Sequence, residues 1–257
     1  MTLRLSYWLL ISLIVCGSPL RTTAQSEVPA SAECNVPGYL YISGPTHGLK
    51  AILQKKDRVT ILALGSSRTW AGGNSAATAF SAQLESALKG VLPHLEIHIE
   101  HRSIFGELAE EAFERVKATV AEVEPDLVIW QVGTNAILAR LDPELFQRGL
   151  ADTLEWFTSH GLDVVLVDPI YNARLAADDD YKRIVAAIAE AAAEKHVPLV
   201  LRSEATWHLA EQKRNSKLNQ FALRELSYGC LAEHLGRGIA LWLSKNDAAA
   251  PLPGEQP

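Results

Sequence analysis

Between residues 58 and 243, segments with the hydrophobic pattern of strands alternate with segments whose apolar positions have helical spacing. Five short runs rich in β-branched and aliphatic residues predict strands, at 58–64, 95–101, 125–133, 163–168 and 197–201. Apolar positions at helical spacing predict helices between and after these runs, at 77–92, 107–123, 142–161, 178–196 and 226–243. Asp142 is the expected N-cap of the third helix, and Gly161 closes it.

This alternation predicts an α/β fold with right-handed crossovers and a parallel sheet covered by helices on both faces. Five strands fit a three-layer, flavodoxin-like arrangement with strand order 2-1-3-4-5. Sites in such sheets lie beyond the carboxyl ends of the strands. Three polar segments fall at such ends, and we expect them to meet there: 65–68, 101–107 and 132–136.

The first 24 residues have the layout of a signal peptide, with Arg4 before an apolar run of about 13 residues and small residues after it. An uncleaved anchor is the alternative, but the run is shorter than the roughly 20 residues that span a bilayer. We therefore expect a secreted or periplasmic protein with no stable membrane span after cleavage. A polar arm is expected at 25–57, the folded domain at 58–245 and a disordered tail at 246–257.

Charge and cysteine content narrow the range of partners. Without residues 1–24 the chain keeps 22 basic and 30 acidic residues, a net charge of −8, and no basic tract, so we expect no nucleic-acid partner. No cluster of His, Cys, Asp and Glu shows metal-ligand spacing, so neither a metal nor another cofactor is expected. Cys34 and Cys230 remain, either as a disulfide or as two buried thiols. The sequence does not indicate an oligomeric state.

The three strand-end segments carry the candidate chemistry. They contain the triplet Gly65-Ser66-Ser67, the glycine Gly106 and the triplet Gly133-Thr134-Asn135, in that order. This series resembles the conserved blocks of the SGNH (GDSL) hydrolase superfamily, which usually has Gly-Asp-Ser in the first block. The resemblance implies that Ser67 is the nucleophile of an acyl or acetyl ester hydrolase. It also implies that the Gly106 N–H and the Asn135 amide hold the oxyanion of the reaction.

Physical reasoning agrees with these roles. A serine at a strand-to-helix junction faces helix N–H groups that favour developing negative charge, and donors from neighbouring loops can converge on one oxygen. The alternative for both Ser67 and Asn135 is helix capping, since each stands where a helix could begin.

The resemblance fails at the catalytic base. The family supplies an Asp-x-x-His motif just before its C-terminal helix. Aligning residues 227–234 with the family's ending places Asn219 at the aspartate position and Ala222 at the histidine position. Alanine can neither accept nor donate a proton in place of histidine. We therefore expect a weak or inactive hydrolase.

Other side chains are candidates for a substitute base or for the pocket. His101, at the end of a strand, and His208, in a region expected to be irregular, are the candidate bases. Glu107 is a weak candidate base or a residue that favours a helix dipole, and Arg68 is a candidate pocket residue. His234 is expected to be a partly exposed helix residue.

Three hypotheses for the function follow. The first is an exported hydrolase-like protein that acts weakly, or not at all, on a small-molecule or polysaccharide ester. The second is a non-catalytic module that binds an envelope glycan or another ligand in the same cleft. The third is an active esterase whose base is His101 or His208.

Overall fold

The computed structural model describes most of the chain from residue 57 onward and short pieces before it. The described residues are 31, 34–35, 40–41, 57–65, 80–103, 109–214, 217 and 220–246. The expected signal peptide at 1–24 and the tail after Asn246 lie outside them, as does most of the arm at 25–57.

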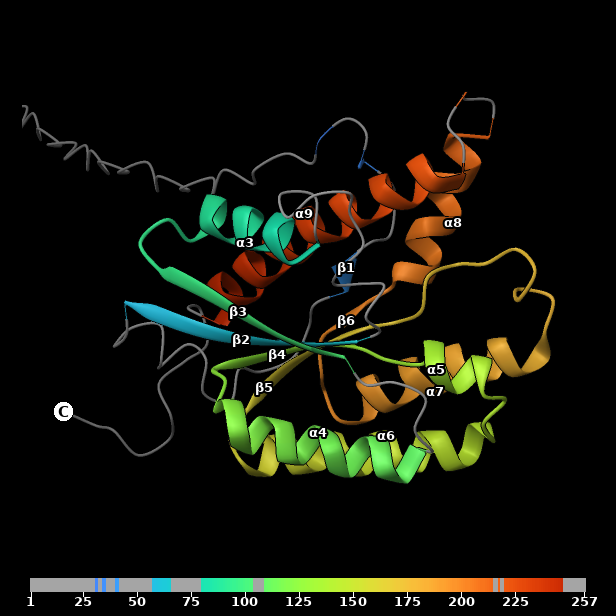
Figure 1. Ribbon diagram of the computed structural model, residues 1–257, viewed down its shortest axis with the longest axis horizontal. Helices are drawn as coiled ribbons and strands as arrows, with labels where there is room; N and C mark the ends of the chain where they lie inside the picture. Colours follow the sequence, from blue (N-terminus) through green and yellow to red (C-terminus); the bar gives the residue numbers. More distant parts are fainter. Residues whose placement is uncertain are drawn as a thin grey trace, which may run out of the picture.

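A six-stranded sheet forms the centre of the molecule (Figure 1). Its order is β1-β6-β5-β4-β2-β3, and five of its strands run parallel, which confirms the predicted order 2-1-3-4-5. Each parallel strand lies within two residues of its predicted run at either end: β2 (Arg58–Gly65), β3 (Glu96–Ser103), β4 (Leu127–Gln131), β5 (Asp163–Val167) and β6 (Leu199–Val200). The antiparallel edge strand β1 (Leu40–Tyr41) has no counterpart among the predicted strands.

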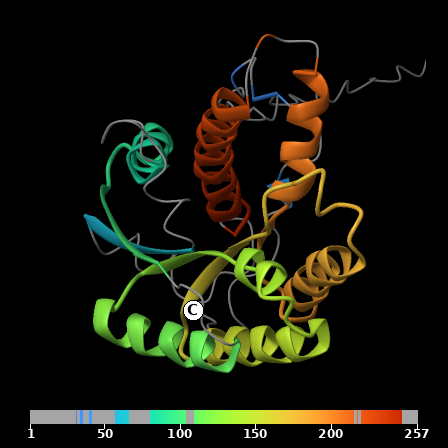
Figure 2. The ribbon, with the colours of Figure 1, turned by 45° about the vertical axis from the view of Figure 1, so that its right-hand side comes forward.

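Helices cover both faces of the sheet, as the alternation of elements predicts (Figures 1 and 2). One layer contains α3 (Phe80–Val91) and α9 (Gln220–Asn246). The other contains α4 (Ala109–Val123), α6 (Pro143–Ser159) and α7 (Asp179–Glu194). Two shorter helices, α5 (Thr134–Leu138) and α8 (Arg202–Gln212), follow β4 and β6 at the carboxyl end of the sheet.

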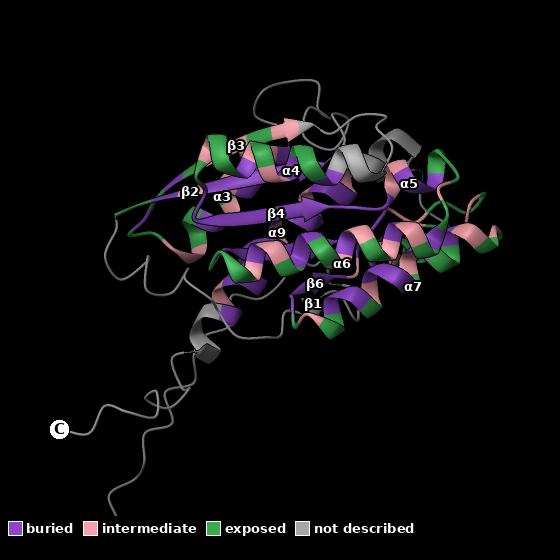
Figure 3. Ribbon diagram, turned by 90° about the horizontal axis from the view of Figure 1, so that it is seen from below, coloured by how far each residue is buried: buried purple, intermediate pink, exposed green. Residues whose placement is uncertain are grey.

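The central strands are apolar on both faces because each face is covered. On β2, Leu62 and Leu64 pack into the layer of α4, α6 and α7, whereas Ile61 and Ala63 pack toward α3 and α9. All four side chains are at most 2% exposed. Buried strands therefore read as continuous apolar runs rather than as alternating ones. Figure 3 shows the same division, with buried strands behind helices whose outer faces are exposed.

The third predicted helix begins and ends as its sequence indicates. The Asp142 side chain accepts a hydrogen bond from the backbone N–H of Leu145 (2.9 Å), which confirms Asp142 as the N-cap of α6. Gly161 follows the helix with a φ of 67°, a conformation that favours glycine.

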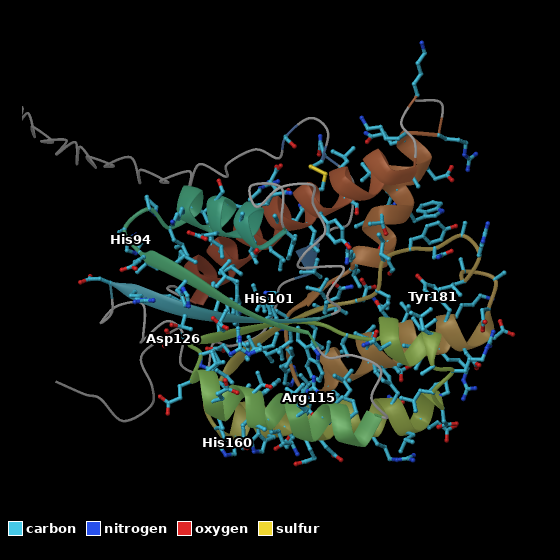
Figure 4. All side chains as sticks on the ribbon, in the orientation of Figure 1. His94, His101, Arg115, Asp126, His160 and Tyr181 are labelled. Carbon is cyan, nitrogen blue, oxygen red and sulfur yellow. A yellow bond between two sulfur atoms is a disulfide. The ribbon has the colours of Figure 1, made fainter. Side chains whose placement is uncertain are left out.

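The described N-terminal residues contact α9 through Cys34 and the edge of the sheet through strand β1. Cys34 and Cys230 form a disulfide, drawn in yellow over α9 in Figure 4. Close to it, His234 Nε2 donates a hydrogen bond to the Cys34 carbonyl oxygen (2.9 Å). His234 is 4% exposed, so its expected partial exposure was wrong. Burial lowers its pKa, and the bond to the Cys34 carbonyl partly offsets that effect. The N-terminal chain covers this part of α9, and no local pattern in α9 signals that cover.

The region containing His208 was also predicted wrongly, because it is helix α8 and not irregular chain. Its buried positions mix polar with small and apolar residues (Arg202, Ala205, Thr206 and Leu209), so the hydrophobic periodicity that identifies the other helices is weak here. Tertiary contacts at its first turn, described below, help to hold this helix.

Candidate active site

The strands that lead into the candidate motifs end side by side. Gly65 ends β2 and pairs with Ser103, the last residue of β3. On the other side of β2, Leu64 pairs with Trp130 near the end of β4. The chain therefore enters all three candidate segments from the same edge of the sheet, on the right in Figure 1, where α5 and α8 also lie. Sites in α/β sheets lie beyond the carboxyl ends of the strands, and all three candidate segments begin at that end.

Several candidate residues themselves lie outside the described part of the chain. These are Ser67, Arg68, Gly106, Glu107 and Asn219. Ala222 belongs to the first turn of α9, which begins at Gln220, six residues before the predicted start. The position that the family gives to its histidine is thus helical in this protein.

The Gly133-Thr134-Asn135 segment forms the turn from β4 into α5. Gly133 is the N-cap residue of α5, with a φ of 95°. A Cβ placed on it would lie 2.7 Å from Ile188 Cδ1 and 3.0 Å from Pro169 Cγ. Both the dihedral angle and the lack of space therefore require glycine. Asn135 is the second residue of the helix and not its N-cap, so the capping alternative for Asn135 is wrong. Its side chain is partly exposed at the carboxyl end of β4.

The two candidate substitute bases occupy different sides of this end. His101 pairs with Ala63 of β2, is exposed, and lies on the same face of edge strand β3 as Ile97 and Ile99, toward α3 (Figure 4). His208 is partly buried on α8, where its Nε2 lies 3.8 Å from Glu204 Oε1. The ring of Trp207 packs edge-on against it, with ring centroids 4.5 Å apart.

Asp168, directly after β5, is a buried acid that sequence reasoning did not single out. Its side chain is 1% exposed and accepts hydrogen bonds from the Ser203 backbone N–H (2.8 Å) and from the Ser203 hydroxyl. Burial raises the pKa of Asp168 to about 7, although the Ser203 hydrogen bonds and the Arg202 charge favour the ionised form. Asp168 thereby caps the first turn of α8 from a neighbouring strand.

Arg202, the first residue of α8 and two positions after β6, is the second such residue. It is 1% exposed, and its Cζ lies 4.7 Å from the centre of the Tyr228 ring of α9. Burial lowers its pKa, while Tyr228 and Asp168 act in the opposite direction. Asp168 directly follows β5, and Arg202 follows β6 after one more apolar residue, Leu201. A polar residue at the end of an apolar run is also the feature that marks the Gly133 segment. Applying that rule to every strand would have found them.

The described residues contain no group of three or more His, Cys, Asp or Glu side chains arranged to hold a metal ion. Within that same part of the chain, no helix has the length and apolar character needed to cross a membrane.

Solved structures with a similar fold include two named esterases. TesA is 19% identical, with a TM-score of 0.54 over 70% of this chain and 99% of its own. The psychrotrophic esterase EstA from Pseudoalteromonas sp. is 18% identical, with a TM-score of 0.55 over 72% and 98% of the two chains. A mutant of Axe2, an acetyl-xylooligosaccharide esterase from Geobacillus, is 17% identical, with a TM-score of 0.54 over 70% and 94%. At such identities the likeness concerns the fold.

A search of curated proteins found no match. The model of the Non-GDSL lipase-like family, in contrast, matches residues 33–243, which include every described strand and the three candidate segments. Together with the sheet order and the structural neighbours, this match shows that the chain has the SGNH hydrolase fold and belongs to the Non-GDSL lipase-like family.

Proposed function

We propose that this protein is an exported ester hydrolase of the SGNH type whose reaction is slow because the usual histidine base is missing. The observation that carries the proposal is the position of Asn135. It is the second residue of α5, just after β4, and β4 lies next to β2, whose carboxyl end leads to Ser67 two residues later. The two structural neighbours that are named as esterases support an ester as the substrate, in small-molecule or polysaccharide form.

The reaction assigns one task to each group. The Ser67 hydroxyl attacks the acyl carbonyl, and the Asn135 amide and Gly106 N–H donate hydrogen bonds to the oxyanion. The proton lost by Ser67 passes through solvent water to the alcohol that leaves as the tetrahedral intermediate collapses. Water then attacks the acyl-serine, which frees the acyl group as a carboxylic acid and restores the Ser67 hydroxyl. With alanine at position 222, the serine proton has no imidazole to receive it. Oxyanion stabilisation and binding alone retain roughly 10³–10⁴-fold acceleration over water in serine hydrolases whose triad is removed.

The disulfide supports export. Disulfides persist in oxidising compartments and are rare in the cytosol, and Cys34 and Cys230 are joined here. The expected signal peptide at 1–24 is consistent with a secreted or periplasmic location.

Hydrolysis of p-nitrophenyl acetate by purified variants tests the proposal. The wild type should hydrolyse the ester slowly. Asn135→Ala should lower kcat by a further factor of roughly 10²–10³, the effect expected for loss of one oxyanion donor. The double variant Asn219→Asp/Ala222→His should raise turnover by roughly 10²-fold or more, since positioned general bases contribute about that much. Ala222→Gln is the matched control, because glutamine has a similar size and cannot act as a base.

Two outcomes would support a different function. Rapid hydrolysis by the wild type that is abolished by Ser67→Ala would contradict the missing base, and His101→Ala and His208→Ala would then locate the substitute. Glycan binding that survives Ser67→Ala, without any hydrolysis, would favour the non-catalytic binding module.

A further inference from the structure

Unsatisfied polar atoms gather at the carboxyl end of the sheet. Among the described residues, the buried side-chain atoms without a hydrogen-bond partner are Gln131 Oε1, Thr134 Oγ1, Tyr181 Oη, Arg202 Nε and Arg202 Nη2. Gln131 ends β4, Thr134 begins α5 and Arg202 follows β6. Tyr181, on α7, lies near α5 in Figure 4, and burial together with the Asp168 charge raises its pKa to about 12. Buried polar groups in native proteins are almost always satisfied, so this concentration points to a polar ligand at this end.

Arg202 is the most informative of these residues. Nε and Nη2 are the two guanidinium nitrogens whose N–H groups point in the same direction, and together they form a fork that matches the two oxygens of a carboxylate. Both are buried and without a partner. The nearby acid does not fill the fork, because Asp168 accepts its hydrogen bonds from Ser203. Tyr228 lies with its ring centre 4.7 Å from Cζ, and its side chain also hydrogen-bonds to the guanidinium. Nε and Nη2 still have no hydrogen-bond partner.

The fork lies on the same face of the sheet as Gln131, at the end where the candidate segments begin. The contact of its guanidinium with Tyr228 of α9 places Arg202 on the side of the sheet covered by α3 and α9, toward which Val200 also packs. Gln131 lies on that side as well, two residues after Ile129. Because Leu64 pairs with Trp130, Gly65 lies level with Gln131. Three strand spacings of about 4.8 Å separate β2 from β6, so Arg202 lies on the order of 15 Å from the chain that leads to Ser67.

We propose that Arg202 binds a carboxylate carried by the ester substrate. This inference rests on the proposed hydrolase function and adds the substrate class to it, namely small esters with one free carboxylate several atoms from the ester bond. A carboxylate fits better than a phosphate dianion because a single guanidinium, with the acid Asp168 beside it, suits one negative charge. Gln131 Oε1 then accepts from a hydroxyl or water that accompanies the ligand.

Burial determines both the strength and the manner of binding. A charge pair formed away from water is stronger than the same pair at the surface. Since Arg202 is 1% exposed, side chains around it must move when the carboxylate enters, and Tyr228 is one of them.

The test compares charged and neutral esters of matched shape. For a carboxylate on the acyl side, p-nitrophenyl hemisuccinate is compared with p-nitrophenyl butyrate. For one on the alcohol side, 4-acetoxybutyrate is compared with butyl acetate. In Arg202→Met, kcat/KM for the charged ester of the correct pair should fall about 10- to 100-fold more than for its neutral partner, the size expected for charge-assisted hydrogen bonds. Arg148→Met, which removes an exposed arginine of α6, should leave the preference unchanged.

A binding measurement separates this inference from the hydrolase function. Millimolar succinate should raise the Tm of the wild type and of Arg148→Met, but not that of Arg202→Met. If Arg202→Met does not fold, Arg202→Lys serves instead, since lysine keeps the charge without the paired N–H groups.

Each result has a defined meaning. If neutral esters are hydrolysed and the Arg202 variants keep the wild-type preference between charged and neutral esters, the carboxylate site is overturned and the hydrolase stands. If no ester is hydrolysed, the hydrolase fails and the succinate shift alone decides. A shift that requires Arg202 supports the site, and an absent shift, or one equal in wild type and variant, overturns it.

Discussion

Asp168 should make the stability of this protein depend on pH, and Asp168→Asn should remove that dependence. The carboxyl group is buried between the end of β5 and the start of α8, and burial raises its pKa from 3.8 to about 7. Asparagine has nearly the same shape, and its side-chain oxygen can accept the hydrogen bond of the Ser203 N–H, as Asp168 does. The substitution therefore removes the titration while keeping the packing and this cap of the helix.

The sign follows from proton binding. Between about pH 4 and pH 7 the folded protein holds a proton on Asp168 that the unfolded chain releases. The free energy of unfolding contributed by this group therefore falls as pH rises through that window and levels off above it. A shift from 3.8 to about 7 corresponds to roughly 4 kcal/mol at about 1.4 kcal/mol for each pKa unit. Asp168→Asn should gain up to that amount relative to the wild type between pH 4 and pH 8.

Urea unfolding, followed by circular dichroism at several pH values from 4 to 8, measures this difference. Asp152→Asn, which removes an exposed carboxyl from α6, is the matched control and should run parallel to the wild type. If the curves of Asp168→Asn and the wild type are also parallel, Asp168 is ionised throughout the range, and the reasoning from its burial is refuted.

The remaining predictions concern the backbone turn and the disulfide. Gly133→Ala should cost about 2–5 kcal/mol in urea unfolding, because a φ of 95° strains alanine and its Cβ meets Ile188 at 2.7 Å. Gly161→Ala, where φ is also positive but nothing lies within 4 Å, should cost only about 1–2 kcal/mol, and equal costs would contradict the steric argument. The Cys34→Ser/Cys230→Ser variant should lose about 3–5 kcal/mol, because the bond closes a loop across 196 positions. A Tm that is the same with and without reductant would argue against that contribution.

The sheet could be predicted well from local pattern alone. A short apolar run such as residues 58–64 is typical of a strand that is buried on both faces of a sheet. The helices between such runs restrict the connections to right-handed parallel crossovers. Asp142 and Gly161 could be assigned because a cap and a left-handed turn depend on only a few neighbouring residues.

Other features depend on residues distant in sequence, and they were missed or misjudged. Helix α8 is held partly by Asp168, 35 positions before Ser203. His234 is buried because the chain around Cys34, 200 positions earlier, covers it. Strand β1 is too short to show a periodicity, and it exists through its pairing with β6.

By itself, the sequence determined the order of elements, the parallel sheet and the end of the sheet at which the candidate motifs lie. Hydrophobic periodicity and turn chemistry act over a few residues, so local sequence is enough to reveal them. Only the tertiary structure decided that an acid and an arginine after β5 and β6 are enclosed together. The local sequence does not show whether a charged side chain will be buried or exposed to water. Its pKa and its need for a partner are set by the elements that fold over it.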